Sequence, residues 1–490
     1  MDSTDLLAFT PHRSVVDGVP VYSMDDTTIQ PAIALTFRVG RVDERVEQRG
    51  VTHLVEHLSL HEFHGAPYFF NGQVGGTTTV FAATGDAEQV VTFARDLCRN
   101  LKNLPLARMR REVQVLVTES QDHLPALQSH LLSIHCGYTR YGSMAMPELG
   151  LAKVREADVR AWAAAMFTRE NLAVWIAGVA PEALTFDLPS GSRVPVPEPT
   201  QIPSLQPPIF VTKEIGGVGL SALTEWSLPL KVAAMACQHR LHERLRVREG
   251  LSYAALGHVD RLTSRMGHVF VGSDCVATAA DQTTAALLET VSAIATDGHT
   301  PDDLRHGLSA TRRTYATHSN VSEILNQWVH AELVGFEQGT ISAELDSMEA
   351  VGPRDVAAAL RQVMDAALLI VPAGCEPTGG RFRRYSGPTA SVLRGRTFYK
   401  QPAFLTFRAR VNYIAVNTEG VTYVDDQGKP TTIYFSRCAG MLKGTDGKRV
   451  LLGEDAQSIA FTPSDWPDGQ EIGSLLDAAV PDEQIIWCLP

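Results

Sequence analysis

The residues best suited to chemistry stand in one short segment, residues 50–58, which reads GVTHLVEHL. His53 and His57 are four residues apart, so on a helix their imidazoles lie on one face, one turn from each other. Two imidazoles placed in this way can bind one metal ion, and Zn²⁺ is the redox-inert ion that suits them. Glu56 lies on the same face, where it could take a proton from water without binding the metal. The pattern H-x-x-E-H therefore predicts a zinc-dependent hydrolytic site.

A zinc site of this kind needs a third protein ligand, and a second amphipathic segment offers two carboxylates. Residues 104–124 have helical periodicity, with an apolar stripe formed by Leu106, Met109, Val113, Leu116 and Val117. Glu112 and Glu119 are seven residues apart in this segment, which places both on one face of the expected helix. The residues alone leave open which carboxylate reaches the metal, and a solvated helix face is the alternative for both.

H-x-x-E-H followed by a helix with two glutamates seven residues apart resembles the pitrilysin/insulysin family of zinc peptidases, which includes mitochondrial processing peptidase. The resemblance implies that Glu119 is the third zinc ligand, and that Glu112 supports the site without binding the ion. It also implies that the strand in residues 71–81 (NGQVGGTTTVF) borders the cleft, where a peptide substrate adds by main-chain pairing. Asn71 would then help to hold the substrate backbone. Gly72 stands where the family usually has alanine.

A second signature of the resemblance lies in residues 241–253, which read LHERLRVREGLSY. Arg246 and Tyr253 are seven residues apart across Gly250. By itself this spacing is equally typical of a surface arginine and a strand tyrosine. The resemblance implies that both side chains face the zinc, hold the substrate carbonyl and stabilise the oxyanion. A guanidinium and a phenol hydroxyl are suitable donors for the charge that develops on a scissile carbonyl.

One interval departs from the family pattern. His57 and Glu119 are 119 − 57 = 62 residues apart, which is shorter than the family usually shows. The shortfall lies between His57 and Asn71, so we expect the rim of the cleft to lack a helix and the metal site to be kept. His61 is four residues after His57 and could compete as a ligand. We interpret His61 and His64 instead as end-of-helix or loop residues.

Length and composition favour a globular protein of two or three domains, because 490 residues can bury more than one core. The net charge of −12 argues against nucleic acid and anionic membranes as partners. No apolar run approaches the length of a membrane span, and the N-terminus has no signal-peptide pattern. The seven cysteines are dispersed and never form C-x-x-C, which is typical of reduced thiols. We therefore expect a cytoplasmic protein.

The order of expected elements divides the chain into three folded parts and two linkers. These are a metal-binding peptidase domain at 1–184, a proline-rich linker at 185–208, a second, Arg/Tyr-bearing peptidase-like domain at 209–375, a linker at 376–395, and a small β-barrel or β-roll at 396–490. The first two folded parts predict an α+β fold of two similar domains, each with an antiparallel-type sheet covered by helices. The tail is expected to be all-β with one helix, vaguely similar to pleckstrin-homology-like modules, and to bind a partner or brace a dimer.

Together these patterns predict a zinc endopeptidase that hydrolyses unfolded peptides. Family members enclose the substrate between two such two-domain halves, so the resemblance implies a second subunit. Because the chain keeps both the metal motif and the Arg246/Tyr253 pair, a homodimer with two reciprocal sites is the simplest prediction. A heterodimer with a non-catalytic relative stays open. The alternatives are a maturation protease that cuts one leader peptide, and a non-catalytic binding or assembly subunit, which would usually lack one of these residue sets.

Overall fold

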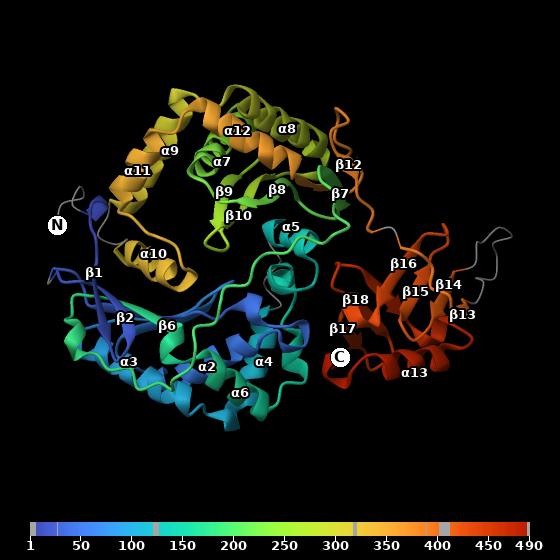
Figure 1. The fold of residues 1–490 in the computed structure, drawn as a ribbon, viewed down its shortest axis with the longest axis horizontal. Coiled ribbons are helices and arrows are strands. Elements are labelled where there is room, and N and C mark those ends of the chain that lie inside the picture. The colour runs from blue at the N-terminus through green and yellow to red at the C-terminus, as the bar shows by residue number, and fades with distance from the viewer. Residues whose placement is uncertain are drawn as a thin grey trace.

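The computed structural model describes residues 6–26, 28–120, 127–316, 321–388, 390–400 and 412–487. Two six-stranded sheets with their helices form the lower and upper parts of the molecule in Figure 1, and a β-rich unit lies to the right. This arrangement confirms the predicted α+β architecture of two similar domains followed by a β-rich C-terminal part. The predicted domain boundaries themselves stay predictions.

The first sheet has the strand order β1-β2-β6-β3-β5-β4, so β4 lies at an edge. Its strands are β1 (His12–Val16), β2 (Val19–Met24), β3 (Ala32–Phe37), β4 (Phe69–Val74), β5 (Thr79–Thr84) and β6 (Leu172–Ala177). β2 and β6 are parallel and the other pairs are antiparallel, so the sheet is mixed where an antiparallel type was expected. A parallel pair can form here because β2 and β6 are joined by a long stretch of chain that includes β3, β4, β5 and several helices, and not by a tight hairpin turn.

Alternation along the strands gives the first sheet two different faces. Ile33, Leu35 and Phe37 of β3 point into a core shared with four helices, whereas Ala34 faces the opposite side. The helices beneath the sheet are α2 (Val51–Leu60), α3 (Ala87–Lys102), α4 (Met109–Ser120) and α6 (Glu156–Met166). This core fixes α2 and α4, the two helices that carry the candidate ligands, against the same sheet.

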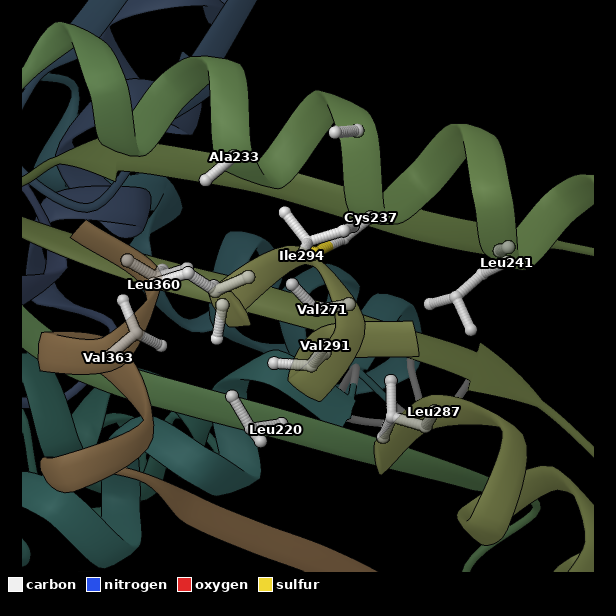
Figure 2. Packing of buried hydrophobic residues seen from close by; sticks show 14 of the residues in the cluster. Leu220, Ala233, Cys237, Leu241, Val271, Leu287, Val291, Ile294, Leu360 and Val363 are labelled. Carbon is white, nitrogen blue, oxygen red and sulfur yellow. The ribbon is translucent and has the colours of Figure 1, made fainter. Parts of the chain in front are cut away.

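The second sheet has the order β12-β7-β11-β8-β10-β9. Its strands are β7 (Ile209–Lys213), β8 (Gly217–Glu225), β9 (Ala255–Arg261), β10 (Met266–Asp274), β11 (Leu368–Pro372) and β12 (Arg383–Arg384). The helices are α7 (Leu228–Leu241), α8 (Ala280–Asp297), α9 (Pro301–Tyr315), α11 (Ile341–Glu349) and α12 (Pro353–Asp365). Figure 2 shows side chains of α7, α8 and α12 meeting Leu220 and Val271 of the sheet. β7 pairs in parallel with β11 and β12, so this sheet is mixed as well.

On each sheet packs one helix that follows the helices of the other domain in the chain. α5 (Leu127–Cys136) follows α4 but packs on the second sheet, where Leu131 contacts the cluster that contains Phe270. α10 (Val321–Val334) follows α9 but lies on the open face of the first sheet, where Leu325 joins the cluster of Ala34 (Figure 1). The two sheets are therefore connected by packed helices as well as by the linker.

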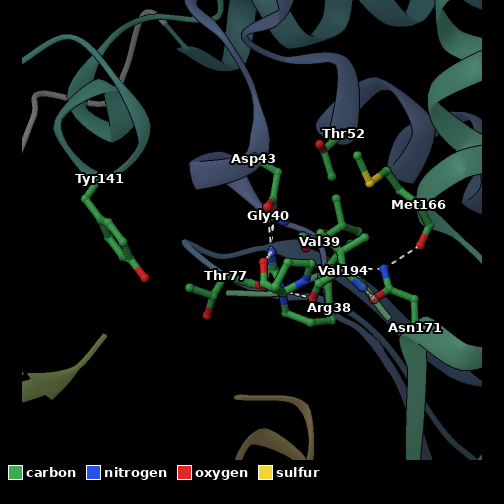
Figure 3. Close-up of polar contacts among 12 residues, drawn as sticks. Arg38, Val39, Gly40, Asp43, Thr52, Thr77, Tyr141, Met166, Asn171 and Val194 are labelled. Carbon is green, nitrogen blue, oxygen red and sulfur yellow. Dashed lines mark hydrogen bonds and ion pairs between the residues drawn. The ribbon is translucent and has the colours of Figure 1, made fainter. Parts of the chain in front are cut away.

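The linker at 185–208 is fastened to the first domain by polar contacts (Figure 3). The buried Arg38 guanidinium donates hydrogen bonds to the carbonyl oxygens of Val194 and Pro195, each at 3.1 Å. Arg38 also pairs with Asp43, and Asn171 accepts a hydrogen bond from the Val194 backbone N–H at 3.0 Å. The second predicted linker, 376–395, contributes β12 to the second sheet and is therefore partly structured.

The C-terminal part contains two four-stranded sheets, with the orders β13-β14-β15-β16 and β19-β18-β17-β20. The elements are β13 (Arg396–Tyr399), β14 (Tyr413–Val416), β15 (Gly420–Val424), β16 (Pro430–Tyr434), β17 (Cys438–Lys443), β18 (Arg449–Gly453), β19 (Ser458–Phe461), α13 (Gly469–Ala479) and β20 (Ile485–Trp487). We refer to β13 through β20 as the C-terminal module. The helix was predicted, whereas β13 and the central strand β17 were not. The last strand expected from the sequence is IIWCL, 485–489, and β20 matches it as far as Trp487, whereas Cys488 and Leu489 lie outside the described residues.

Two general findings bear on the sequence predictions. Among the described helices, none is both long and apolar enough to cross a membrane. The six described cysteines are buried and free.

Candidate metal centre

A buried ion pair sets the start of α2, the helix that carries the metal motif. The Glu44 carboxylate accepts hydrogen bonds from the backbone N–H groups of Gly50 and Thr52, at 3.1 and 2.8 Å. Arg49 donates to the same carboxylate at 2.9 Å. Gly50 has a φ of 97°, which glycine adopts without strain. An acidic group at this end also interacts favourably with the helix dipole.

The structure brings His53, His57 and Glu119 together around one point. One ligand atom from each residue lies within 4.8 Å of the others. His57 Nε2 is 3.6 Å from Glu119 Oε2, and the two imidazole rings meet edge to face with centroids 4.9 Å apart. Two imidazoles and one carboxylate, with one position left open, form the donor set of a catalytic zinc site. These residues therefore fit a zinc ion.

Glu56 is buried beside both imidazoles. Its Oε2 atom lies 3.8 Å from His53 Nε2 and 3.7 Å from His57 Nε2. Burial raises the pKa of Glu56 to about 7, and the nearby carboxylates of Glu119 and Glu148 add to the rise. A carboxylate with a pKa in this range can both accept and return a proton near neutral pH.

Gly72 of β4 leaves the space that Glu56 occupies. A Cβ atom at position 72 would lie only 1.9 Å from Glu56 Oε1 and 2.7 Å from Leu60 Cδ1. Alanine, which the family usually has here, would require the carboxylate to move. The glycine therefore helps to set the position of Glu56.

We expect Gly72→Ala to reduce kcat for peptide hydrolysis by about 10²-fold, because a displacement of about 1 Å in a reacting group has an effect of this size. Zinc affinity should stay close to that of the wild type, since the atoms nearest to an added Cβ belong to Glu56 and Leu60 and not to a ligand. Steady-state kinetics and a zinc titration would measure the two quantities. Gly339→Ala is the matched control, because an added Cβ there meets nothing closer than 3.9 Å. An unchanged kcat would show that Gly72 does not set the position of Glu56.

Glu112 lies on the side of His57 away from Glu119. Its Oε2 atom is 3.6 Å from His57 Nδ1, the nitrogen that does not face the ligand cluster. His61 Nδ1 lies 4.0 Å from the other oxygen of Glu112, and His61 is outside the three-residue ligand group. Between α2 and β4 the chain forms only a short 3₁₀ helix, His61–Phe63, in agreement with the shortened rim expected from the sequence.

Glu148 is a member of the site that the sequence did not indicate. Its Oε1 atom lies 2.8 Å from His53 Nδ1, although the two residues are 95 positions apart. Burial alone would lower the pKa of His53, but the hydrogen bond to Glu148 and the negative charges of Glu148, Glu56 and Glu119 together raise it. Burial would raise the pKa of Glu148, but the hydrogen bond from His53 and the positive charges of His53, Arg41 and Arg49 together lower it. A carboxylate in this position fixes the tautomer and orientation of a ligating histidine.

The raised pKa of Glu56 predicts a pH-dependent stability of the metal-free protein. Because the folded pKa of about 7 exceeds the ordinary value of 4.5, the stabilisation from the protonated form is complete below 4.5 and is lost as pH rises through about 7. Above that pH the buried charge costs about 3 kcal/mol. We therefore expect Glu56→Gln to raise the free energy of unfolding by about 3 kcal/mol at about pH 8, and by much less at about pH 5.

Urea denaturation in the presence of a chelator would measure this difference. Glu62→Gln serves as the control, because Glu62 is exposed on the neighbouring turn. The prediction would be wrong if the free energies of unfolding of the wild type and Glu56→Gln differed by the same amount at both pH values.

Arg246 and Tyr253 form a pair at the surface of the second domain. Arg246 lies in a π-helical segment, His242–Arg248, and its guanidinium donates to the Tyr253 carbonyl at 2.7 Å. The guanidinium also lies 4.8 Å from the centre of the Tyr253 ring. Asp274 holds the turn by accepting the backbone N–H groups of Tyr253 and Ala254. The Tyr253 side chain is 76% exposed, and these contacts all lie within the second domain.

Asn71 is exposed on β4, at the edge of the first sheet. Among the described strands, β4 pairs only with β5. Asn71 lines a cavity of about 590 Å³ whose other walls include Ala34, Trp175 and Asn326. An exposed edge strand can accept an extended peptide by main-chain pairing.

Comparison with protein-family models gives no match, and comparison with curated sequences gives none either. Solved structures do match. The chain is similar to a protease from Helicobacter pylori, with a TM-score of 0.62 and 13% identity over 74% of this chain and 100% of that one. It is also similar to a peptidase M16 inactive domain from Pseudomonas fluorescens, with a TM-score of 0.61 and 12% identity over 75% and 100%. Pitrilysin matches with a TM-score of 0.57 and 13% identity, over 76% of this chain and 45% of pitrilysin.

The fold is that of the M16 peptidases. The resemblance to the pitrilysin-type family predicted from the sequence is thereby confirmed for the fold. Because one of the matching proteins is described as an inactive domain, an M16 fold does not by itself establish catalysis. Activity depends on the side chains at the metal centre.

Proposed function

We propose that this protein is a zinc-dependent endopeptidase that hydrolyses unfolded peptides. The observation that carries the proposal is the meeting of His53, His57 and Glu119 from two helices, with the buried Glu56 beside both imidazoles. A bound Zn²⁺ would supply Lewis-acid chemistry, which polarises the scissile carbonyl and lowers the pKa of water. His53 and His57 would hold the ion through Nε2, since the Nδ1 atoms face Glu148 and Glu112.

Glu56 would act as general base and then as general acid. It would accept a proton from the attacking water as oxygen bonds to the peptide carbon, and return it to the nitrogen as the C–N bond breaks. Glu112 and Glu148 would keep the imidazoles in orientation from the far side of each ring.

The edge strand β4 supports an extended peptide as substrate. A peptide that pairs with β4 would pass beside Glu56, because Gly72 of that strand lies directly against the Glu56 carboxylate. Asn71 would hold its backbone. Main-chain pairing of this kind requires an unfolded segment, so folded proteins should be poor substrates.

The second part of the proposal is a homodimer in which each chain completes the site of the other. Arg246 and Tyr253 are exposed, and their contacts lie within their own domain, so they are available to a second copy. In the partner's site they would donate hydrogen bonds to the oxyanion. A heterodimer with a related chain is the alternative arrangement.

A complementation experiment tests the shared site. Glu56→Gln loses the base and Arg246→Ala loses the oxyanion donor, so each homodimer should have little activity. In a mixed dimer one site has both groups, and mixing equal amounts should restore about one quarter of the wild-type activity. The control mixture is Glu56→Gln with His53→Ala, which damages the same half-site in both chains. No recovery, with subunit exchange verified by co-purification of two differently tagged chains, would contradict the homodimer.

Cleavage profiling with a proteome-derived peptide library tests the activity itself. Wild type is expected to cut many peptides, and a chelator or Glu56→Gln should abolish cleavage. Cleavage confined to one type of leader peptide would favour a maturation protease. Zinc binding without cleavage of any peptide would favour a non-catalytic subunit, for which the similarity to an inactive M16 domain is the supporting observation.

A further inference from the structure

The C-terminal module docks on the first domain close to the metal centre. An apolar cluster joins Val46, which precedes α2, to Leu452 of β18 and Ile486 of β20, all of them buried. Met146 and Leu149 pack against this cluster from a third segment, and Leu442 of β17 completes the contact. We call residues 137–153, which lie between the module and the first domain, the docking segment.

Polar contacts fasten both ends of the docking segment to the module. At one end the Tyr138 backbone N–H donates to the Glu454 carbonyl at 3.3 Å, and a Cβ at Gly137 would lie 1.7 Å from that oxygen. The backbone of the docking segment at Gly137 therefore lies so close to the backbone of the module that only glycine fits there. At the other end Lys153 Nζ donates to the carbonyls of Glu483 and Ile485, the latter at 3.0 Å.

The same segment is attached to the start of the metal helix on its opposite side. The buried Arg49 guanidinium donates to the Met146 carbonyl at 3.4 Å. The Gly150 backbone N–H donates to the Arg49 carbonyl at 3.0 Å, and Arg49 directly precedes Gly50 at the start of α2. Glu148 lies between these two attachments.

We propose that the C-terminal module braces the metal centre by holding Glu148 against His53. Leu149 packs on the module. Glu148, its neighbour in the chain, accepts a hydrogen bond from His53 Nδ1, with 2.8 Å between the two atoms. The module thereby positions a metal ligand through the docking segment. Glu148 is a positioning residue in this scheme, and the inference rests on the proposed zinc site.

A double-mutant cycle on zinc affinity tests this inference in the full-length chain. Glu148→Ala should lower zinc affinity by about 10- to 100-fold, as expected when the partner of a ligating histidine is lost. Leu452→Ala in the module should lower it by about 3- to 10-fold, and should have no further effect when Glu148 is already alanine. The visible absorption of the Co²⁺-loaded protein should change in both single variants, because it reports ligand geometry.

Two further variants separate bracing from general loss of stability. Ile472→Ala creates a cavity in the core of the module away from the docking cluster, and should leave zinc affinity unchanged. Lys153→Met removes the hydrogen bonds to the module and should also lower zinc affinity by about 3- to 10-fold. It replaces Leu452→Ala in the cycle if Leu452→Ala does not fold. Unchanged zinc affinity in a folded docking variant, or additive effects with Glu148→Ala, would overturn the inference. Absence of zinc binding by the wild type would instead overturn the proposed function.

Discussion

Replacement of Glu56 by glutamine is expected to reduce kcat for peptide hydrolysis by about 10²- to 10⁴-fold, the usual contribution of a positioned general acid–base group. Glutamine keeps the shape of the side chain between the imidazoles and Gly72, but it cannot accept a proton. Because Glu56 is not part of the ligand cluster, zinc affinity should change by less than about tenfold. The combination of retained metal and lost turnover is specific to a base that is not a ligand.

Single-turnover cleavage of a quenched peptide, with zinc measured on the same sample, would test this expectation. Glu62→Gln is the matched control, since Glu62 follows the same helix but lies exposed. Activity within a few-fold of the wild type in Glu56→Gln would exclude Glu56 as the proton carrier. Loss of zinc would mean instead that Glu56 binds the ion.

Replacement of Glu119 by alanine is expected to lower zinc affinity by more than about 100-fold, which exceeds the effect of losing a residue that only orients a ligand. Glu119 supplies the only candidate ligand from α4 in the described cluster, so without it two histidines on one helix remain. Glu112→Ala should lower affinity by only about 10- to 100-fold, because Glu112 approaches His57 from the Nδ1 side.

Competition with a chromogenic chelator would measure both affinities under the same conditions. The variant with the larger loss of zinc affinity identifies the glutamate of α4 that binds the ion. A larger loss for Glu112→Ala than for Glu119→Ala would contradict the assignment.

The sequence predicts the parts of the site that depend on local geometry. The spacing of His53, Glu56 and His57 determines their relative positions as soon as the segment is helical. In the same way, the seven-residue spacing of Glu112 and Glu119 places both side chains on one face of α4. The strands and helices around them follow from apolar periodicity, which is strong in α3 and β3. For these elements local pattern and tertiary packing agree.

The features that the sequence did not predict depend on contacts between distant segments. Glu148 reaches His53 across 95 residues, and nothing in its neighbours M-P-E-L-G marks it as part of a metal site. β17 reads CAGMLK, with few residues that favour strands, and it forms because β18 and β20 pair with it on both sides. The packing of α5 and α10 on the sheet of the other domain likewise has no signal in local periodicity.

The proposed mechanism requires that three side chains from two helices hold one zinc ion beside Glu56. An anomalous difference map from crystals of the zinc-loaded protein, recorded at the zinc absorption edge, tests it most directly. We expect one peak at about 2.0–2.2 Å from His53 Nε2, His57 Nε2 and a Glu119 oxygen, with Glu56 near the ion but not bound to it. A peak at another position, or an ion held without Glu119, would contradict it.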